Sequence, residues 1–586
     1  MLERADANKS PKRRIQALII VMCLFGVVAI GKLIYVQVWQ HRSYIEKASA
    51  QQSRKFIIPA RRGQVFVQDG GKELYPIALN QQQYLLAADP KFIKDHDKNF
   101  EAVKEFVPEE KREELRSKLK DKEARYIVIS RRIDSRSADR LKELHMPGII
   151  LTPIDGRNYP EGEMFAHITG YVNDDGVGQY GLEQQMNQVL GGTDGANKAV
   201  TDSLGVPITS SENTLVAPKN GSDLVLTIDR GLQAIAAKAI EDAVTKNRAE
   251  SGSIIIMDPN TGAIKAMVNY PSYNPNDYRA VKSEEYGRFI NSSISNLFEP
   301  GSGFKVITMA AGLDTGKIKP EMKYDDTGEV RVGDKVIKNA DNHKFGISTM
   351  TDIIQKSLNT GVVYVLRHLG TDPNKITLKS KEVLYEYIQR FGFGERTGIE
   401  LAGEAKGVVK DPKAYDVDYA NMTFGQGISS TSLQLTNAVA AVANGGTLYK
   451  PYVIDKEITA NGEVRQHKPE VIRDNVISSQ SAAQLSEMME QVVQHGSGWP
   501  TRMKGYRIAG KTGTAQVPRS DGKGYDDKKN IGSFVGFAPV EDPKFVMLVR
   551  VDYPKVEGFA EKTAVPTFAE VTKQLFMYYQ VPPSGN

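Results

Sequence analysis

The sequence predicts an α+β protein that one N-terminal helix anchors in a membrane. Residues Ile15 to Gly31 are apolar and uncharged, which is typical of a membrane-spanning helix. Further along, strand-forming segments flank a long helical stretch between Ser302 and Asn444. A helical middle between two strand-forming ends favours one antiparallel sheet that both ends of a domain build and that helices cover.

The composition is that of a large globular protein. At 586 residues the chain is too long for one hydrophobic core, and we expect about two to four domains. The 76 lysines and arginines nearly balance the 71 acidic residues and are spread along the chain, which argues against a nucleic-acid partner. Cys23 is the only cysteine, so an intramolecular disulfide and a cysteine-based metal site are excluded.

The apolar segment has the length and the flanks of a membrane anchor. With Lys32 snorkelling, the span extends over residues 15–38, which exceeds the roughly 20 residues that a bilayer needs. The positive-inside rule places the basic residues 1–14 in the cytoplasm and the bulk of the chain outside. A cleaved signal peptide is the alternative, but the apolar run is long and no clear A-x-A site follows it.

Residues 45–220 are predicted to form a β-rich first domain. Short apolar stretches and turn-forming residues alternate over residues 50–85 and again over residues 159–195. Between them, residues 90–146 are highly charged with apolar residues at helical spacing, which predicts a helical insertion. A polar, glycine-containing stretch at Pro218–Ser222 marks the boundary to the rest of the chain.

Residues 221–586 are predicted to form a second domain with strands at both of its ends. The turn Asp258–Gly262 between two apolar runs is typical of a β-hairpin. We expect strands at 224–228, 253–257, 263–268, 507–517, 531–537 and 545–551, and flanking helices at 230–246 and 567–579.

Lys511–Thr514 is the most informative segment, because two unrelated chemistries use such a sequence. Gly505–Thr512 fits the phosphate-loop pattern G-x-x-x-x-G-K-[ST], which needs a buried strand before its first glycine and a helix after its lysine. Here polar residues precede Gly505, and Pro518 and a polar run follow. The apolar residues lie inside the motif, which predicts a strand that carries Lys511 and disfavours the phosphate loop.

Ser302 and Lys305 form an S-x-x-K match at the start of an apolar stretch that predicts a core helix ending near Gly316. The helix start offers free backbone N–H groups to a developing oxyanion. Apolar surroundings disfavour an ammonium group, so Lys305 is expected to be neutral and to act as a base towards the serine hydroxyl. A second cation such as Lys511 nearby would act in the same direction.

Each motif alone is a weak signal. A lone S-x-x-K is more often a capping serine with a solvated lysine, and two further matches, Ser117–Lys120 and Ser520–Lys523, lie in polar surroundings. Ser357–Asn359 alone fits a helix cap followed by a turn. The three elements in this order, each in suitable secondary structure, together indicate a serine acyl-transfer site.

In this site, Ser357 would relay a proton between Lys305 and a leaving amine, and Asn359 would orient the lysine and the substrate amide. The oxyanion would accept hydrogen bonds from the backbone N–H groups of Ser302 and Thr514. The catalytic candidates are Ser302, Lys305, Ser357, Asn359 and Lys511. The candidates for binding a substrate carboxylate and backbone are Lys511, Thr512, Gly513 and Thr514.

Other catalytic patterns are absent from the sequence. There is no G-x-S-x-G elbow, and none of the eight histidines has an obvious nucleophile partner. There is no H-E-x-x-H motif or clustered ligand spacing either, so we expect no metal and no cofactor.

The motif triple is shared by β-lactamases and penicillin-binding proteins, and further stretches match the latter. These stretches are Arg61–Gly63, Arg157–Gly162, Ala166–His167, Gly170–Tyr171, Gly181–Glu183, Leu190–Gly192, Met257–Gly262, Tyr270–Asn276, Phe424–Ile428 and Gly510–Gln516. On these residues the chain resembles a class B penicillin-binding protein, a monofunctional peptidoglycan D,D-transpeptidase, over nearly its full length. No glycosyltransferase domain fits before residue 220, which argues against the bifunctional class.

The resemblance implies an elongated pedestal domain followed by a transpeptidase domain of the penicillin-recognising serine fold. Ser302 would attack the penultimate D-Ala carbonyl of a stem peptide and expel D-Ala, and an amine of a neighbouring stem would then take the acyl group. β-Lactams would acylate the same serine. The implied partners are a membrane-embedded glycosyltransferase and proteins of the division or elongation complex. Asn274–Asn276 and Arg157–Gly162 look more like the division branch than the elongation branch.

Two alternatives use the same residues. A β-lactamase or D,D-carboxypeptidase would pass the acyl group to water, and a penicillin-sensing scaffold would keep the motifs as binding elements only.

The sequence also departs from the family pattern at two places. Gly303 stands where the family commonly has Thr or Val and is expected to loosen the helix start, and Gly496–Gly498 replaces a common Gly-Thr-Gly.

Overall fold

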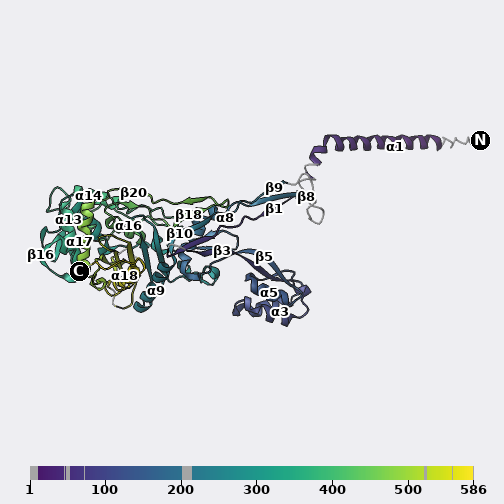
Figure 1. Cartoon of the computed structure of the whole chain (residues 1–586). Helices are drawn as coiled ribbons and strands as arrows, with labels where there is room; N and C mark the ends of the chain where they lie inside the picture. Colours follow the sequence, from purple (N-terminus) through teal and green to yellow (C-terminus); the bar gives the residue numbers. More distant parts are fainter. Residues whose placement is uncertain are drawn as a thin grey trace, which may run out of the picture. The chain divides into compact units, whose positions relative to one another are not determined.

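The computed structural model describes residues 11–44, 47, 53–70, 73–200, 214–519, 524–556 and 559–584. The chain forms two compact units (Figure 1). One unit combines Met1–Arg61 with Gly192–Asn220, and the other combines Arg62–Gly191 with Gly221–Asn586.

The first unit contains the apolar helix and a small sheet. Helix α1 (Pro11–Ile34) continues as a π-helical turn over Tyr35–Trp39. Among the described residues, only Arg13–Trp39 is a helix long and apolar enough to cross a membrane, with a mean hydropathy of 2.7, and its most apolar stretch is not buried. This helix is consistent with the predicted membrane anchor. The sheet is antiparallel and joins β8 (Gly195–Val200) to β1 (Ser53–Ile58) and β9 (Thr214–Val216).

The second unit holds two larger sheets. Among the described strands, seven form a sheet in the order β19-β18-β10-β2-β3-β4, with β5 also paired to β3. Strand β10, which was expected to open the second domain, is present but lies in this sheet, parallel to β2. The strands are β2 (Val65–Asp69), β3 (Glu73–Ala88), β4 (Ile127–Asp134), β5 (Ile149–Asn158), β10 (Asp223–Asp229), β18 (Ile454–Ile458) and β19 (Val464–Gln466).

The predicted helical insertion is only partly helical. Helices α3 (His96–Val103), α4 (Arg112–Lys120) and α5 (Ser135–Glu143) form at the expected helical spacing and share a separate core. The prediction is wrong between α4 and α5, where β4 pairs with the long strand β3. The short apolar run that forms β4 has no helical periodicity, and its pairing with β3 could not be inferred from local sequence.

The other large sheet confirms the predicted closure by the two ends of the second domain. Among the described strands, five pair antiparallel in the order β12-β11-β23-β22-β21. The first two come from the hairpin after residue 250, and the other three come from the last fifth of the chain. They are β11 (Ser251–Met257), β12 (Ile264–Tyr270), β21 (Ala509–Pro518), β22 (Tyr525–Ala538) and β23 (Phe545–Asp552).

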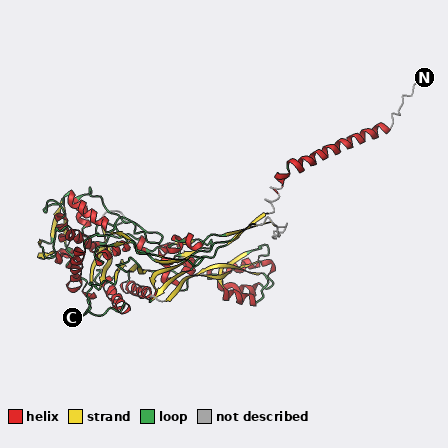
Figure 2. Cartoon of the chain, turned by 45° about the horizontal axis from the view of Figure 1, so that its top comes forward, coloured by secondary structure: helices red, strands yellow, loops and turns green. Residues whose placement is uncertain are grey.

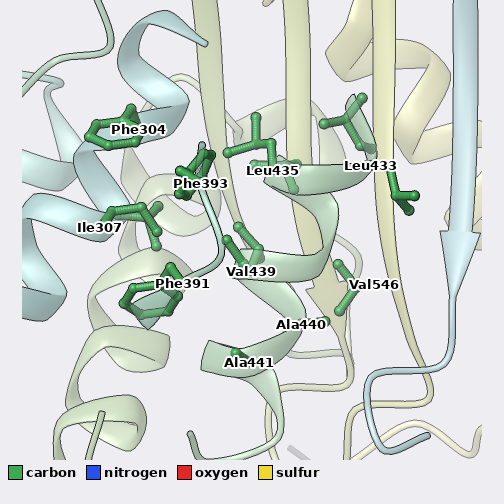
Figure 3. Close-up of a cluster of buried hydrophobic side chains, with 14 of the residues drawn as sticks. Phe304, Ile307, Phe391, Phe393, Leu433, Leu435, Val439, Ala440, Ala441 and Val546 are labelled. Carbon is green, nitrogen blue, oxygen red and sulfur yellow. The ribbon is translucent and has the colours of Figure 1, made fainter. Parts of the chain in front are cut away.

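Both faces of this sheet are buried, which explains its continuous apolar strands. Ile254 and Ile256 of β11 pack against α9 (Arg230–Asn247) and α18 (Ala564–Tyr578), whereas Ile255 faces the opposite core. That opposite core contains α16 (Ser432–Ala443), whose residues are nearly all buried. Figure 3 shows Leu435 and Val439 of this helix pointing towards Phe393 and Ile307. Helices gather around the sheet in Figure 2.

The predicted helical middle is interrupted. Short strands pair as β13 (Lys323–Asp326) with β16 (Gly346–Thr349) and as β14 (Glu329–Val332) with β15 (Lys335–Lys338). Helices still dominate residues 302–444 as predicted, but these four strands at residues 323–349 were not expected. The helices of the middle are α11 (Lys305–Asp314), α12 (Met350–Gln355), α13 (Asn359–His368), α14 (Leu378–Arg390), α15 (Asp416–Met422) and α16, and α17 (Ser479–His495) follows.

The buried carboxylate of Glu183 pairs with two arginines near the start of the second unit. Glu183 is fully buried and accepts hydrogen bonds from Arg62 Nε at 2.7 Å and from Arg157 Nε at 2.8 Å. Arg157 Nη1 also donates to the Gly63 carbonyl at 2.8 Å. Both arginines depend on this single anion, because a buried charge is tolerated only when it is paired and hydrogen bonded.

We expect Glu183→Gln to destabilise the folded protein. The change leaves the buried guanidinium group of Arg157 and the partly buried one of Arg62 without their anion, and breaking a buried ion pair typically costs about 3–5 kcal/mol. The measurement is thermal unfolding of the full-length protein in detergent, followed by circular dichroism. The matched control is Asp97→Asn, which removes an exposed ion pair with Arg116 and should leave the midpoint unchanged. Equal midpoints for wild type and Glu183→Gln would contradict the inferred role of this cluster.

Candidate active site

The three motif segments meet in one cleft of about 860 Å³ in the second unit. Ser302 lines it from the start of α11, and Ser357 and Asn359 line it from the junction of α12 and α13. Thr512 and Thr514 line it from β21, the edge strand of the five-stranded sheet. Segments more than 200 residues apart in sequence therefore supply one site, as the motif order predicted.

Ser302 lies in a 3-10 turn, Gly301–Phe304, that runs directly into α11. The helix is buried along its length and ends just before Gly316, which has a positive φ of 66°, as predicted. Gly301 also has a positive φ, and a Cβ there would lie 2.8 Å from the Thr514 carbonyl oxygen. Glycine at this position therefore lets the nucleophile turn approach the edge of β21 closely.

Two lysines meet on one serine hydroxyl. Lys305 and Lys511 are both fully buried, and each places its Nζ 3.0 Å from Ser357 Oγ. Lys305 Nζ also donates to the Ser357 carbonyl at 2.6 Å, and Lys511 Nζ donates to the Thr512 carbonyl at 3.2 Å. Neither lysine has a carboxylate partner within hydrogen-bond distance in the described part of the chain.

Burial changes the protonation of this pair. Loss of hydration lowers the pKa of Lys305 well below its ordinary value, and the neighbouring charge of Lys511 lowers it further. Burial also lowers the pKa of Lys511 to about 7. Lys305 is thus the amine that gives up its proton first. As a neutral amine it can accept a hydrogen bond from Ser357, whose oxygen accepts one from Lys511.

Ser357 reaches both lysines from a constrained backbone. Its φ is +58°, in the left-handed region that non-glycine residues rarely adopt, and it lies between α12 and α13. The start of α13 is fixed by Asn339, whose Oδ1 accepts from the backbone N–H groups of Asn359 at 2.9 Å and Thr360 at 3.2 Å. These contacts hold the loop that carries Ser357.

A buried carboxylate supports Asn339 in turn. Asp326 is fully buried and accepts from Asn339 Nδ2 at 2.9 Å and from the Thr360 hydroxyl at 2.6 Å. Asp326 ends β13 and Asn339 directly follows β15, two short strands that the sequence did not predict. We name Asp326, Asn339 and Thr360 the Asp326 frame. No sequence pattern marked it, because its members lie 13 to 34 residues apart and become neighbours only in the folded chain.

The edge of β21 supplies the hydroxyl and backbone groups. The Thr514 carbonyl oxygen lies beside the nucleophile turn, since a Cβ on Gly301 would be 2.8 Å from it, and the N–H and C=O of one residue in an antiparallel strand point to the same side. The N–H of Thr514 therefore faces the cleft beside the turn of Ser302. Ser497, which the sequence noted only as a departure, joins the site through a 2.7 Å hydrogen bond to Thr512 Oγ1.

Two predicted contacts are not formed. Lys305 Nζ is hydrogen bonded to Ser357 and not to Ser302 within the described residues, although the two residues are one helical turn apart. Asn359 makes no described hydrogen bond to Lys305, so the prediction that Asn359 orients this lysine is wrong. Its Nδ2 donates to the Lys338 carbonyl at 2.8 Å. The contact that orients the lysine comes from the Ser357 carbonyl instead.

The two glycines that the sequence singled out have different surroundings. A Cβ at Gly513 would lie 2.5 Å from Ser533 Oγ and 2.8 Å from the Pro300 carbonyl oxygen. Gly513 is therefore already required for the nucleophile turn to pack on β21, and a role towards substrate stays a prediction. A Cβ at Gly303 would meet only Leu435, at 3.4 Å. The expected effect of Gly303 on reactivity also stays a prediction.

The alternative motif assignments do not fit. Lys511 lies in the middle of β21 and no helix follows it, so Gly505–Thr512 is not a phosphate loop. Ser117–Lys120 lies at the end of the charged helix α4, outside the cleft. Ser520–Lys523 lies outside the described residues. Only the match at Ser302 combines a core helix with the other two motifs.

Comparison with known proteins agrees with this geometry. The family described as the penicillin binding protein transpeptidase domain matches residues 252–573, and the penicillin-binding protein dimerisation domain matches residues 57–226. Stage V sporulation protein D of Bacillus subtilis is 30% identical over 578 residues, which are 97% of this chain and 86% of that protein. Peptidoglycan D,D-transpeptidase FtsI of Buchnera aphidicola is 30% identical over 573 residues, which are 96% of this chain and 95% of that protein.

The fold is also that of a solved structure. A peptidoglycan synthetase from Bifidobacterium adolescentis superimposes with a TM-score of 0.69 at 26% identity, covering 91% of this chain and 98% of its own. The matched transpeptidase region contains all three motif segments and more than half of the chain. The chain therefore belongs to the penicillin-binding proteins, and, because a dimerisation domain precedes its transpeptidase domain, to class B of that family.

Proposed function

We propose that this protein is a serine-type peptidoglycan D,D-transpeptidase that cross-links stem peptides through an acyl-enzyme on Ser302. The observation that carries the proposal is the buried chain from Lys305 through Ser357 to Lys511, in which Ser357 lines the same cleft as Ser302. The name of the Buchnera relative, a peptidoglycan D,D-transpeptidase, supports the same activity.

Acylation follows from the protonation of the pair. Once bound substrate brings the two groups into contact, neutral Lys305 takes the proton of Ser302, whose oxygen attacks the penultimate D-Ala carbonyl of the donor stem. The developing oxyanion accepts hydrogen bonds from the N–H groups of Ser302 and Thr514. Protonated Lys511, with Thr512 and Thr514, binds the terminal carboxylate of the donor. The proton then passes from Lys305 through Ser357 to the departing D-Ala amine.

Deacylation uses the same groups in reverse. An amine of a second stem peptide enters where D-Ala left, and Ser357 and Lys305 take its proton as it attacks the ester carbonyl. The new amide is the cross-link, and Ser302 recovers its hydroxyl proton from Lys305. β-Lactams undergo only the first step, because the ester carbonyl of their acyl-enzyme is not exposed to the acceptor amine.

The cellular setting follows from the anchor and the family. Arg13 and Arg14 lie in the first turns of α1, which by the positive-inside rule places the N-terminus in the cytoplasm and the cleft outside the membrane. We assign residues 45–220 to the pedestal and residues 221–586 to the transpeptidase domain. The resemblance of Asn274–Asn276 and Arg157–Gly162 to the division branch supports a septal role, and it implies a membrane-embedded glycosyltransferase and division proteins as partners.

The first prediction concerns the covalent adduct. Penicillin treatment of the full-length protein should add one penicilloyl group on Ser302, and Ser302→Ala should lose it, as mass spectrometry of tryptic peptides would reveal. Ser357→Ala should keep the adduct but form it about 100-fold more slowly, because its proton relay is gone. An adduct on another residue would exclude the assignment of Ser302. Release of D-Ala from stem peptides without cross-linked product would instead support a carboxypeptidase.

The second prediction concerns pH. Because burial lowers the pKa of Lys511 to about 7, this lysine loses its positive charge as the pH rises through 7 in the free enzyme. The second-order rate constant of penicillin acylation should therefore fall above that pH, and at low pH it should fall again when Lys305 becomes protonated. In Lys511→Arg, whose side chain stays charged, the decline on the alkaline side should disappear. The same alkaline decline in both proteins would refute this assignment.

The third prediction concerns the Asp326 frame. Asn339→Ala removes the acceptor that fixes the start of α13 and one of the donors to Asp326, so Ser357 should lose its fixed position. We expect penicillin acylation to slow by about tenfold. The control is Asn374→Ala, which changes an exposed asparagine outside the cleft and should react at the wild-type rate. A wild-type rate in Asn339→Ala would show that the frame does not position the serine.

A further inference from the structure

The cleft contains a carboxylate that the acylation mechanism does not use. Glu561 lines the cleft together with Ser302 and Thr514, and it is the only acidic residue among the described residues that do so. It makes no hydrogen bond or ion pair within the part of the chain that the structure describes. The two lysines that line the cleft already have carboxylate partners: Lys356 with Asp352 at 2.8 Å and Lys338 with Glu329 at 3.8 Å.

The backbone beside Glu561 is fixed against the strand that binds the donor. The preceding residue, Ala560, is buried, and its N–H lies 3.5 Å from Thr514 Oγ1. Ala560 also packs on Gly532, which pairs with Thr514 in the sheet, since a Cβ on that glycine would lie 3.3 Å from Ala560 Cα. Glu561 itself is exposed. Its carboxylate is therefore held at the Thr514 side of the cleft and remains open to a ligand.

This is the side at which the leaving group departs. The donor's terminal residue lies against Thr512 and Thr514 until the ester forms, and the incoming amine must approach the same carbonyl from the place that this residue vacates. An alkyl amine of the lysine type has a pKa near 10.4 and so arrives as an ammonium ion at neutral pH. A free carboxylate at that place attracts an ammonium ion and repels a second carboxylate.

We propose that Glu561 is a binding residue for the ammonium group of the acceptor stem peptide, a proposal that rests on the transpeptidase function above. Glu561 holds the ammonium ion beside the acyl carbonyl, and the ammonium releases one proton to solvent. The neutral amine then forms the C–N bond and passes its second proton through Ser357 to Lys305. The bond between the carbonyl carbon and Ser302 Oγ breaks, and Oγ takes that proton back. Water needs no such binding residue.

The test measures how the acyl-enzyme divides between an amine and water. Full-length protein in detergent is given an acyl-D-alanyl thioester as donor, with lysine or hydroxylamine as acceptor, and the aminolysis and hydrolysis products are quantified. Lysine carries an ammonium group, whereas hydroxylamine is uncharged at neutral pH. In Glu561→Gln the ratio of aminolysis to hydrolysis with lysine should fall about fivefold, as expected for a partly screened ion pair. The ratio with hydroxylamine should not change.

Two further variants sharpen the comparison. Glu561→Asp keeps the charge on a shorter side chain and should retain most of the preference for lysine. Glu570→Gln makes the same charge change on an exposed position of α18 outside the cleft and should behave as wild type. Because the readout is a ratio within one protein sample, partial loss of folded enzyme does not alter it.

The outcomes separate this proposal from the proposed function. An unchanged ratio with lysine in Glu561→Gln, or an equal fall with both acceptors, would overturn the role of Glu561 while leaving the acyl-enzyme intact. Failure of the wild-type protein to form an acyl-enzyme at Ser302 with either penicillin or the thioester would instead overturn the transpeptidase function. A fivefold fall confined to lysine would support both.

Discussion

The active site depends on two buried lysines that share one hydroxyl group. Burying an amine away from water is unfavourable for its charged form, and placing a second amine next to it adds repulsion. The protein tolerates this arrangement because Lys305 can lose its proton and Ser357 can then bridge a neutral amine and a charged one. The burial and repulsion that lower stability also keep Lys305 neutral, so it can act as a base at neutral pH. A solvated lysine would stay charged at this pH and could not do so.

The rest of the fold holds the three contributors at fixed separation. Lys305 lies on a core helix that packs against α13 and α17, and Lys511 lies on the edge strand of a sheet that both ends of the domain build. Ser357 occupies a left-handed loop, a conformation that persists only when its surroundings impose it. The Asp326 frame provides those surroundings. A site assembled from a helix, an edge strand and a strained loop therefore needs support from short strands that carry no catalytic group.

Sequence reasoning could identify the groups that react but not those that hold them. The S-x-x-K and K-T-G-T segments were recognisable because each lies in a long element with a clear apolar pattern. The sheet closure by β11 and β23 was predictable for the same reason. Strands β13 to β16 were not, because strands of four residues are specified by their pairing partners rather than by periodicity. Asp326, Asn339 and the hydrogen bond that Lys305 donates to the Ser357 carbonyl were therefore not predicted either.

The charges around the cleft must serve two opposite ligands in turn. The donor brings a carboxylate, which favours the protonated state of Lys511, whereas the acceptor brings an ammonium group that must lose a proton. Glu561 acts on this balance as well, because its negative charge raises the pKa of Lys511 and so opposes the effect of burial. One carboxylate at the cleft edge thus influences donor binding through Lys511 and faces the place where the acceptor enters.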